Sequence, residues 1–106
     1  MNGYYKGLFA EYFCIFYVVC RGHRIIGRRI KTPVGEIDIL TRRRGVMYAI
    51  EVKYRSSGLD DAKFALLKSR PRVRNAYKWW SRGRYNASVE FKYFVCSKFR
   101  FEVGSM

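Results

Sequence analysis

The sequence predicts a single α/β domain in which one helix, three strands, a second helix and one or two further strands follow one another. Two observations lead to this class: helical patterns over 4–21 and 60–80, the first apolar on nearly every side and the second with an apolar stripe, and alternation of apolar and polar residues between them. The chain has 106 residues, of which 49% are hydrophobic and 18% aromatic, enough for one hydrophobic core. We therefore expect one domain spanning residues 1–106.

The first segment, residues 4–21, is apolar on nearly every side of the expected helix, and Gly22 is a suitable residue to end it. Such a composition is typical of a helix with little solvent exposure, so we expect this helix to be largely buried. A short strand over 23–30 and a turn at 32–35 follow.

The next strand is expected over residues 34–40, which alternate between apolar and polar side chains. Successive side chains of a strand point to opposite faces of the sheet. Glu36 and Asp38 are therefore expected on one face, with Ile37 and Ile39 on the other.

A second alternating strand is expected over residues 46–54, after a tight and exposed connection. Glu51 and Lys53 share one face of this strand, and Ile50 and Val52 share the opposite face. The short connection predicts that the two strands form a β-hairpin.

The second helix is expected to begin near the acids at 60–61 and to extend to Trp80. Pro71 leaves two alternatives: a kink within one continuous helix, or the first turn of a separate helix capped by Ser69. The remaining segments are a polar loop, a strand and a last short strand, expected over 82–88, 89–96 and 99–103.

The charge is strongly unbalanced, with 22 lysines and arginines against 8 acids and a formal net charge of +14. Such an excess favours an acidic partner, with nucleic acid as the first candidate and an anionic membrane as the second. The longest charge-free apolar run, residues 12–20, is shorter than the roughly 20 residues that a bilayer requires. We expect no membrane span and no membrane partner.

The cysteines are odd in number, widely spaced and surrounded by apolar residues: Cys14, Cys20 and Cys96. This pattern favours reduced core residues of a cytoplasmic protein. A zinc site is not expected, because the chain has one histidine and no C-x-x-C motif.

Half of the eight acids lie in the segments just described: Glu11, Glu36, Asp38 and Glu51. Carboxylates of Asp38 and Glu51 on neighbouring strands, about 4.8 Å apart, can approach one hard cation such as Mg²⁺. Lys53 projects from the same face as Glu51. Two carboxylates, a divalent cation and an ammonium group suit the hydrolysis of a phosphodiester, so we expect these residues to form the site.

Two of these segments, residues 35–40 (GEIDIL) and 50–56 (IEVKYRS), resemble the acidic strand and the E-x-K strand of the PD-(D/E)XK nuclease superfamily. They resemble more closely the YraN-type family of small bacterial proteins. The G-x-x-x-E pattern of that family is matched at residues 7–11. Its final R-F-D-V strand is matched poorly, because Glu90 and Lys92 exchange the two charges.

The resemblance implies a restriction-endonuclease-like mixed sheet flanked by helices. It implies an endonuclease dependent on Mg²⁺ or Mn²⁺ that acts on DNA, including branched DNA, rather than RNA. Asp38 and Glu51 would be the metal ligands, the main-chain carbonyl of Val52 a third ligand, and Lys53 the catalytic lysine.

The resemblance also implies roles for two further acids. Glu11 would reach the metal from the first helix, and the alternative for this residue is a helix-face charge paired with a base such as Lys6. Glu36 would support the site from the face that Asp38 occupies, or lie exposed beside the turn.

Contact with phosphates is expected from basic residues on three segments: Arg42, Arg43 and Arg44 in the hairpin connection, Arg55 after the E-x-K strand, and Lys68, Arg70, Arg74 and Lys78 on the second helix. A homodimer could supply a second site for a second strand. The alternatives are a catalytically inactive nuclease fold that binds DNA or RNA, and a basic subunit of a ribonucleoprotein assembly.

Overall fold

The fold is taken from a computed structural model, which describes residues 3–82 and 88–106. The elements in chain order are α1 (Gly3–Cys20), β1 (Arg24–Thr32), β2 (Gly35–Arg43), β3 (Val46–Tyr54), α2 (Leu59–Ser81), β4 (Ser88–Cys96) and β5 (Phe101–Ser105). This order confirms the predicted succession, although β1 is longer than expected and β5 begins two residues later. Residues 83–87 of the predicted polar loop lie outside the described residues.

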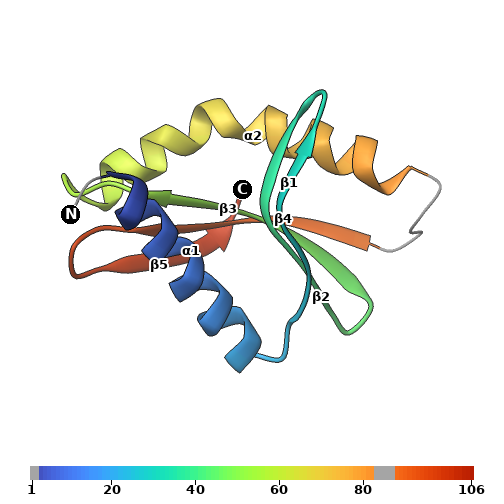
Figure 1. Cartoon of the computed structure of the whole chain (residues 1–106), viewed down its shortest axis with the longest axis horizontal. Coiled ribbons are helices and arrows are strands. Elements are labelled where there is room, and N and C mark those ends of the chain that lie inside the picture. Colours follow the sequence, from blue (N-terminus) through green and yellow to red (C-terminus); the bar gives the residue numbers. More distant parts are fainter. Residues whose placement is uncertain (1–2, 83–87) are drawn as a thin grey trace.

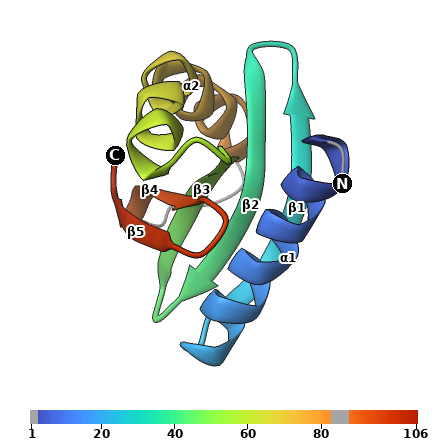
Figure 2. The same ribbon diagram turned by 90° about the vertical axis from the view of Figure 1, so that its left-hand side faces the viewer.

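The strands form one mixed sheet in the order β1-β2-β3-β4-β5. Strands β3 and β4 are parallel and are connected through α2, whereas the other neighbours are antiparallel. The two helices lie on opposite faces of the sheet (Figures 1 and 2). A mixed sheet covered on both faces agrees with the restriction-endonuclease-like fold that the sequence implies.

The alternation of β3 divides the core between the two faces. Ile50 and Val52 pack in the cluster beneath α1, and Ala49 packs in the cluster beneath α2, as the sequence predicts. In the α1 cluster, the helix contributes small side chains, Ala10 and Cys14, both fully buried. Close approach of α1 to β3 follows from these small residues.

Strand β2 does not keep the alternation that its sequence predicts. Ile39 packs beneath α1, whereas Ile37 packs beneath α2, so the prediction of one shared face is wrong. The ladder with β3 ends at the pair Ile39↔Ile50, although β2 begins at Gly35. Beyond that pair β2 bends away from β3 toward α2 (Figure 1), and this twist changes which side of the sheet each side chain meets.

The bend brings the tip of the β1–β2 hairpin against α2. A Cβ atom at Gly35 would overlap the main-chain carbonyl of Arg72, and Gly35 has a φ of 154°. Only glycine permits this approach of one backbone to another. The hydroxyl of Thr32 donates to the Gly35 carbonyl at 2.7 Å and accepts from the Val34 N–H at 3.2 Å, which closes the tip.

Helix α2 is continuous through Pro71, which decides between the two alternatives left by the sequence. Pro71 is exposed, so its ring lies on the solvent side of the helix. The helix is capped by Gly58 without a side-chain hydrogen bond, and Asp60 and Asp61 lie in its first turn. Their contribution is therefore the interaction with the helix dipole and not capping.

Helix α1 is less buried than its composition predicts. Ala10, Cys14 and Val18 are buried, whereas Phe9 and Phe16 are 61% and 71% exposed. A helix that covers one face of a sheet buries a single stripe, and its outer side has no further layer to contact. Cys20, expected in the core, is exposed for the same reason. No helix in the described part of the chain is long and apolar enough to span a membrane.

Candidate metal-binding site

The bend in β2 opens a pocket of about 230 Å³ between α1, α2 and the diverging strands β2 and β3. All four acids singled out from the sequence line it: Glu11 from α1, Glu36 and Asp38 from β2, and Glu51 from β3. Lys53 lines the same pocket. The structure therefore brings together the carboxylates and the lysine that the sequence places on three separate elements.

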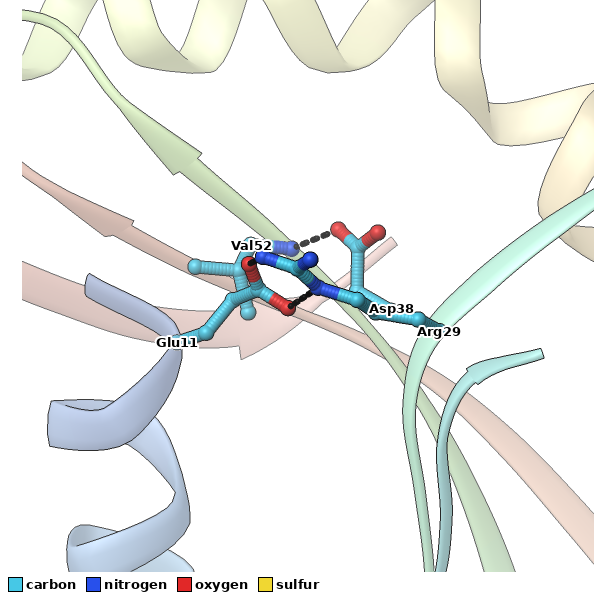
Figure 3. Close-up of polar contacts among 4 residues, drawn as sticks. All are labelled: Glu11, Arg29, Asp38 and Val52. Carbon is cyan, nitrogen blue, oxygen red and sulfur yellow. Dashed lines mark hydrogen bonds and ion pairs between the residues drawn. The ribbon is translucent and has the colours of Figure 1, made fainter. Parts of the chain in front are cut away.

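Asp38 lies at the point where the β2–β3 ladder ends. Its Oδ2 accepts a hydrogen bond from the main-chain N–H of Val52 at 2.9 Å (Figure 3). The Val52 N–H has no main-chain acceptor among the described residues of β2, because the ladder has ended, and the Asp38 carboxylate serves as its acceptor instead. The N–H and C=O of one strand residue point toward the same neighbouring strand. We therefore expect the Val52 carbonyl to face the gap that β2 leaves.

Glu51 and Lys53 form an ion pair on the same side of β3. The Nζ atom of Lys53 lies 3.2 Å from Oε1 of Glu51, whose side chain is 7% exposed. The two-residue spacing within one strand explains the contact, because both side chains project to the same face.

The two central carboxyl groups have raised pKa values. The pKa of Glu51 is raised from 4.5 to about 7, first by burial and then by the negative charge of Asp38, while Lys53 opposes the shift. Burial also raises the pKa of Asp38, while the Val52 hydrogen bond lowers it and the charge of Glu11 raises it. Carboxyl groups that are removed from water and repel each other bind a proton more tightly than isolated ones. A divalent cation would relieve the same repulsion, so the pair fits a hard cation.

Glu11 takes a different partner from the one considered in the sequence. Its carboxylate accepts two hydrogen bonds from the guanidinium of Arg29, at 3.1 Å from Nε and 2.8 Å from Nη2. Figure 3 shows the Arg29 side chain crossing from β1 to α1 beside Asp38. Within the described residues, no three His, Cys, Asp or Glu side chains are grouped closely enough to hold a metal ion.

The oxygen donors that could hold a cation are therefore the carboxylates of Asp38 and Glu51 and the carbonyl of Val52. These are ligands that Mg²⁺ and Mn²⁺ prefer, with the remaining positions filled by water. Glu36 lines the pocket but is exposed, and Glu11 is held by Arg29. Both acids line the pocket, at its periphery.

The basic residues expected to contact phosphates are separated by the fold. Arg70 lines a hollow beside Met106, and the guanidinium of Arg74 lies 4.5 Å from the ring centroid of Phe91, both on the β4 side of α2. Arg55 is exposed and donates to the carbonyl of Tyr54 at 2.7 Å. None of these contacts involves a carboxylate of the pocket.

The remaining predicted cations lie on two other surfaces. Lys68 and Lys78 are exposed on α2. Arg42 and Arg43, expected in the hairpin connection, are the last residues of β2, and of the three arginines only Arg44 lies in the connection; Arg42 and Arg44 are exposed. That connection lies six residues from Glu51 along β3, about 20 Å away. Arg43 is half-buried beside His23, whose pKa is lowered by burial and then by the charge of Arg43.

Two cations that the sequence analysis did not place in the site border the pocket. Arg29 reaches it through the Glu11 ion pair, and Arg72 lines it from α2. Arg29 has a positive φ of 48°. This conformation is uncommon for an arginine and could not be predicted from the sequence. Arg72 lies one helical turn from Lys68, which is the only indication available from the sequence.

Strand β4, which carries the poorly matched R-F-D-V segment, contributes none of the described residues that line the pocket. The carboxylate of Glu90 lies 3.8 Å from Nζ of Lys92, and Lys92 also donates to the hydroxyl of Ser105 at 2.8 Å. The exchange of charges seen in the sequence therefore still permits an ion pair along β4.

Comparison with known proteins places these residues in a wider group. The model of the uncharacterised protein family UPF0102 matches residues 10–105. A UPF0102 protein of Nitrobacter winogradskyi is 45% identical over 78 residues, which are 73% of this chain and 65% of that protein. One of Rhodopseudomonas palustris (strain BisA53) is 43% identical over 75 residues, 70% and 57% of the two chains.

A third relative, the UPF0102 protein Atu0303 of Agrobacterium fabrum, is 35% identical over 82 residues, which are 77% of this chain and 67% of that protein. The chain spans about three fifths of the length of the curated relatives it matches. The matched region of the family contains the whole of β2 and β3 and therefore both central carboxylates.

Proposed function

Because the chain belongs to the uncharacterised family UPF0102, within the PD-(D/E)XK nuclease-like superfamily, we propose that it is a metal-dependent endonuclease that hydrolyses phosphodiester bonds. The observation that carries this proposal is the meeting of Asp38, Glu51 and Lys53 in one pocket of a chain with a net charge of +14. A carboxylate pair on its own would repel a phosphate backbone, whereas the surrounding cations attract it.

Asp38 and Glu51 would hold Mg²⁺ or Mn²⁺ through their carboxylate oxygens, with the Val52 carbonyl as a third ligand. The cation would supply Lewis-acid stabilisation of a phosphoryl oxygen and a lowered pKa for a bound water. Lys53, 3.2 Å from Glu51, would orient the attacking water and stabilise the negative charge that develops on the phosphate. Asp38 keeps its hydrogen bond to Val52, which fixes its carboxylate in the site.

The substrate is proposed to be DNA, including branched DNA, rather than RNA, in keeping with the superfamily. Cytoplasmic location is part of the same proposal. It is supported by the three cysteines, all free in the structure, because structural disulfides are rare in that compartment.

The test is a cleavage assay on labelled duplex, single-stranded and four-way-junction DNA and on structured RNA. Each substrate is incubated with Mg²⁺, Mn²⁺ or EDTA. Glu51→Gln is the informative variant, because it keeps the shape of the side chain and removes its charge. Glu90→Gln is the matched control, because it removes the same charge from an exposed position of the neighbouring strand.

We expect metal-dependent products with the wild type and Glu90→Gln, and a loss of at least about 100-fold with Glu51→Gln, as for the removal of one strong transition-state interaction. Products that persist in Glu51→Gln would exclude this site as the catalyst. The absence of products from every substrate would exclude the proposed reaction.

A second candidate is a nuclease fold that binds nucleic acid without cleaving it. The ion pair between Glu11 and Arg29 favours it, because this pair holds the third acid away from the two central carboxylates. Binding without cleavage would then depend steeply on salt, with a slope of about 0.9 per phosphate contacted on duplex DNA, and would be unchanged in Glu51→Gln.

A further inference from the structure

We propose that a groove between the start of α1 and the β4–β5 hairpin binds single-stranded nucleic acid by stacking bases on exposed phenylalanine rings. The inference rests on the proposed function, since it names the strand that the carboxylate pocket would receive. The groove has a volume of about 480 Å³, within the range of pockets that hold small organic molecules. We call it the aromatic groove; its ring-bearing lining residues are Phe9, Phe13, Tyr54, Phe99 and Phe101.

The rings form a continuous series. The centroid of Phe9 lies 6.4 Å from that of Phe13, which lies 5.2 Å from that of Phe101. Phe101 stacks in turn on the buried ring of Phe94, at 5.5 Å and 15°. The inner rings thus hold the outer ones in place, and Phe9 and Phe101 remain 61% and 46% exposed. Ring faces fixed in this way are suited to stacking on any base.

Phe99 occupies the tip of the β4–β5 hairpin and is 95% exposed. The hairpin is closed by a main-chain hydrogen bond from Ser97 N–H to the Arg100 carbonyl at 2.9 Å, which does not need the phenyl ring. An aromatic side chain at this position adds nothing to the core and costs solvation of apolar surface. Stacking on a ligand accounts for it.

The charges of the aromatic groove select the ligand. Lys6, Lys98 and Arg100 line it, and no acid is among its described lining residues. Cations interleaved with ring faces match a phosphate backbone with unstacked bases. A second copy of the chain would bring these same cations, and a net charge of +14, against each other, which disfavours self-association.

The aromatic groove and the carboxylate pocket share one lining residue, Tyr54, among the described residues. Tyr54 follows Lys53 directly in β3 and lines both cavities. The ammonium group of Lys6 lies over the Tyr54 ring, 5.9 Å from its centroid. A strand stacked in the groove would therefore extend past Tyr54 toward Asp38 and Glu51. The arrangement favours substrates with a single-stranded segment, such as a flap or the open centre of a branched structure.

The experiment measures binding by fluorescence anisotropy of a labelled oligo(dT) strand in EDTA, so that hydrolysis does not contribute. Phe99→Ala and Phe9→Ala remove exposed rings of the groove. Phe64→Ala is the matched control, because Phe64 is 70% exposed on α2, across the sheet. An abasic strand of the same length keeps the phosphates and lacks the bases.

We expect Phe99→Ala to weaken binding of oligo(dT) at least about fivefold, and Phe9→Ala similarly, as measured for the loss of base–aromatic stacking. Phe64→Ala should bind as the wild type does, and the abasic strand should bind the wild type at least fivefold more weakly. Equal binding by Phe99→Ala and Phe64→Ala, or equal binding of the two strands, would overturn the proposal.

Self-association is tested in parallel by sedimentation. A wild-type dimer that dissociates in Phe99→Ala, with unchanged oligo(dT) binding, would assign the groove to a second copy and overturn the proposal. The two proposals fail separately. If the ring variants bind normally but cleavage still depends on Glu51, only the proposal for the aromatic groove is overturned. If the ring variants lose binding but no metal ion supports cleavage, only the proposed hydrolytic function is overturned.

Discussion

Replacing Glu51 with Gln should stabilise the metal-free protein at alkaline pH. The physical reason is that Glu51 is buried and lies beside Asp38, so that its pKa is raised from 4.5 to about 7. A carboxyl group whose pKa rises on folding favours the folded state at pH values below its unfolded pKa. That contribution is lost as the pH rises through the folded pKa. Gln has the same shape, can still accept a hydrogen bond from Lys53, and has no charge to bury.

The size of the effect follows from the shift in pKa. A displacement from 4.5 to about 7 corresponds to about 3 kcal/mol in the free energy of unfolding, and about 2–3 kcal/mol of this change falls between pH 5 and pH 8. The wild type should therefore lose about 2–3 kcal/mol more than Glu51→Gln over this interval. This amount is a substantial part of the stability of a small domain.

The assay is urea denaturation in EDTA at pH 5 and pH 8, followed by tryptophan fluorescence. Glu90→Gln serves as the control for net charge, because Glu90 is exposed and its loss changes the protein charge equally. Identical pH dependence of the wild type and Glu51→Gln would refute the reasoning. Added Mn²⁺ should raise the stability of the wild type at pH 8 and leave Glu51→Gln unchanged, because a ligand stabilises the state that binds it.

Three further predictions concern the walls of the pocket. Gly35→Ala should lower the free energy of unfolding by about 1–3 kcal/mol, because the added methyl group overlaps the backbone of α2; chemical denaturation measures this, and unchanged stability would contradict the close approach. Asp38→Ala should cost about 1–3 kcal/mol by leaving the Val52 N–H without its acceptor, whereas Asp38→Asn should keep slow hydrogen exchange at that amide; equally fast exchange in both variants would argue against the bond. Arg29→Met should cost about 1–3 kcal/mol, because the Glu11 side chain, 13% exposed, would lose its bidentate partner; the same cost in Arg28→Met would show that the pairing is not the cause.

The predictable part of the site is the part that depends on strand periodicity alone. Glu51 and Lys53 are two residues apart in a regular strand, so their contact at 3.2 Å follows from alternation. The order of helices and strands was predictable in the same way, because periodicity distinguishes them. The continuity of α2 was not, because both outcomes at Pro71 satisfy the local constraints.

The part of the site that could not be predicted depends on the place where β2 stops pairing with β3. Ile37 and Ile39 have the alternation of one face, yet they meet different helices because β2 pairs with β3 only from Ile39 onward and its first residues, 35–38, lie outside that ladder. The cause is tertiary: Gly35 must approach α2, and this contact is far away in sequence. The partner of Glu11 was missed for a related reason, since Arg29 reaches it from a left-handed conformation with a φ of 48°.

The exposure of α1 has a comparable explanation. Its apolar composition predicted burial, but composition does not reveal how many layers a short chain can build. The prediction of a largely buried helix is therefore wrong for its outer side, where Phe9 and Phe16 are exposed. This excess of apolar residues over core positions supplies exposed rings of the aromatic groove, such as Phe9.

The hydrogen bond between Asp38 and Val52 gives one carboxylate a mechanical role as well as a chemical one. This bond is a clamp, in that it joins β2 to β3 at the point where the main-chain hydrogen bonds between these two strands end. It thereby connects the β1–β2 hairpin, here called the β1–β2 ribbon, to the rest of the sheet. A cation that engages the same carboxylate would tighten this clamp. The β1–β2 ribbon beyond Ile39 would then open less often, and its amides would exchange with solvent more slowly. Loading of the site and rigidity of the hairpin tip would be a single cooperative event.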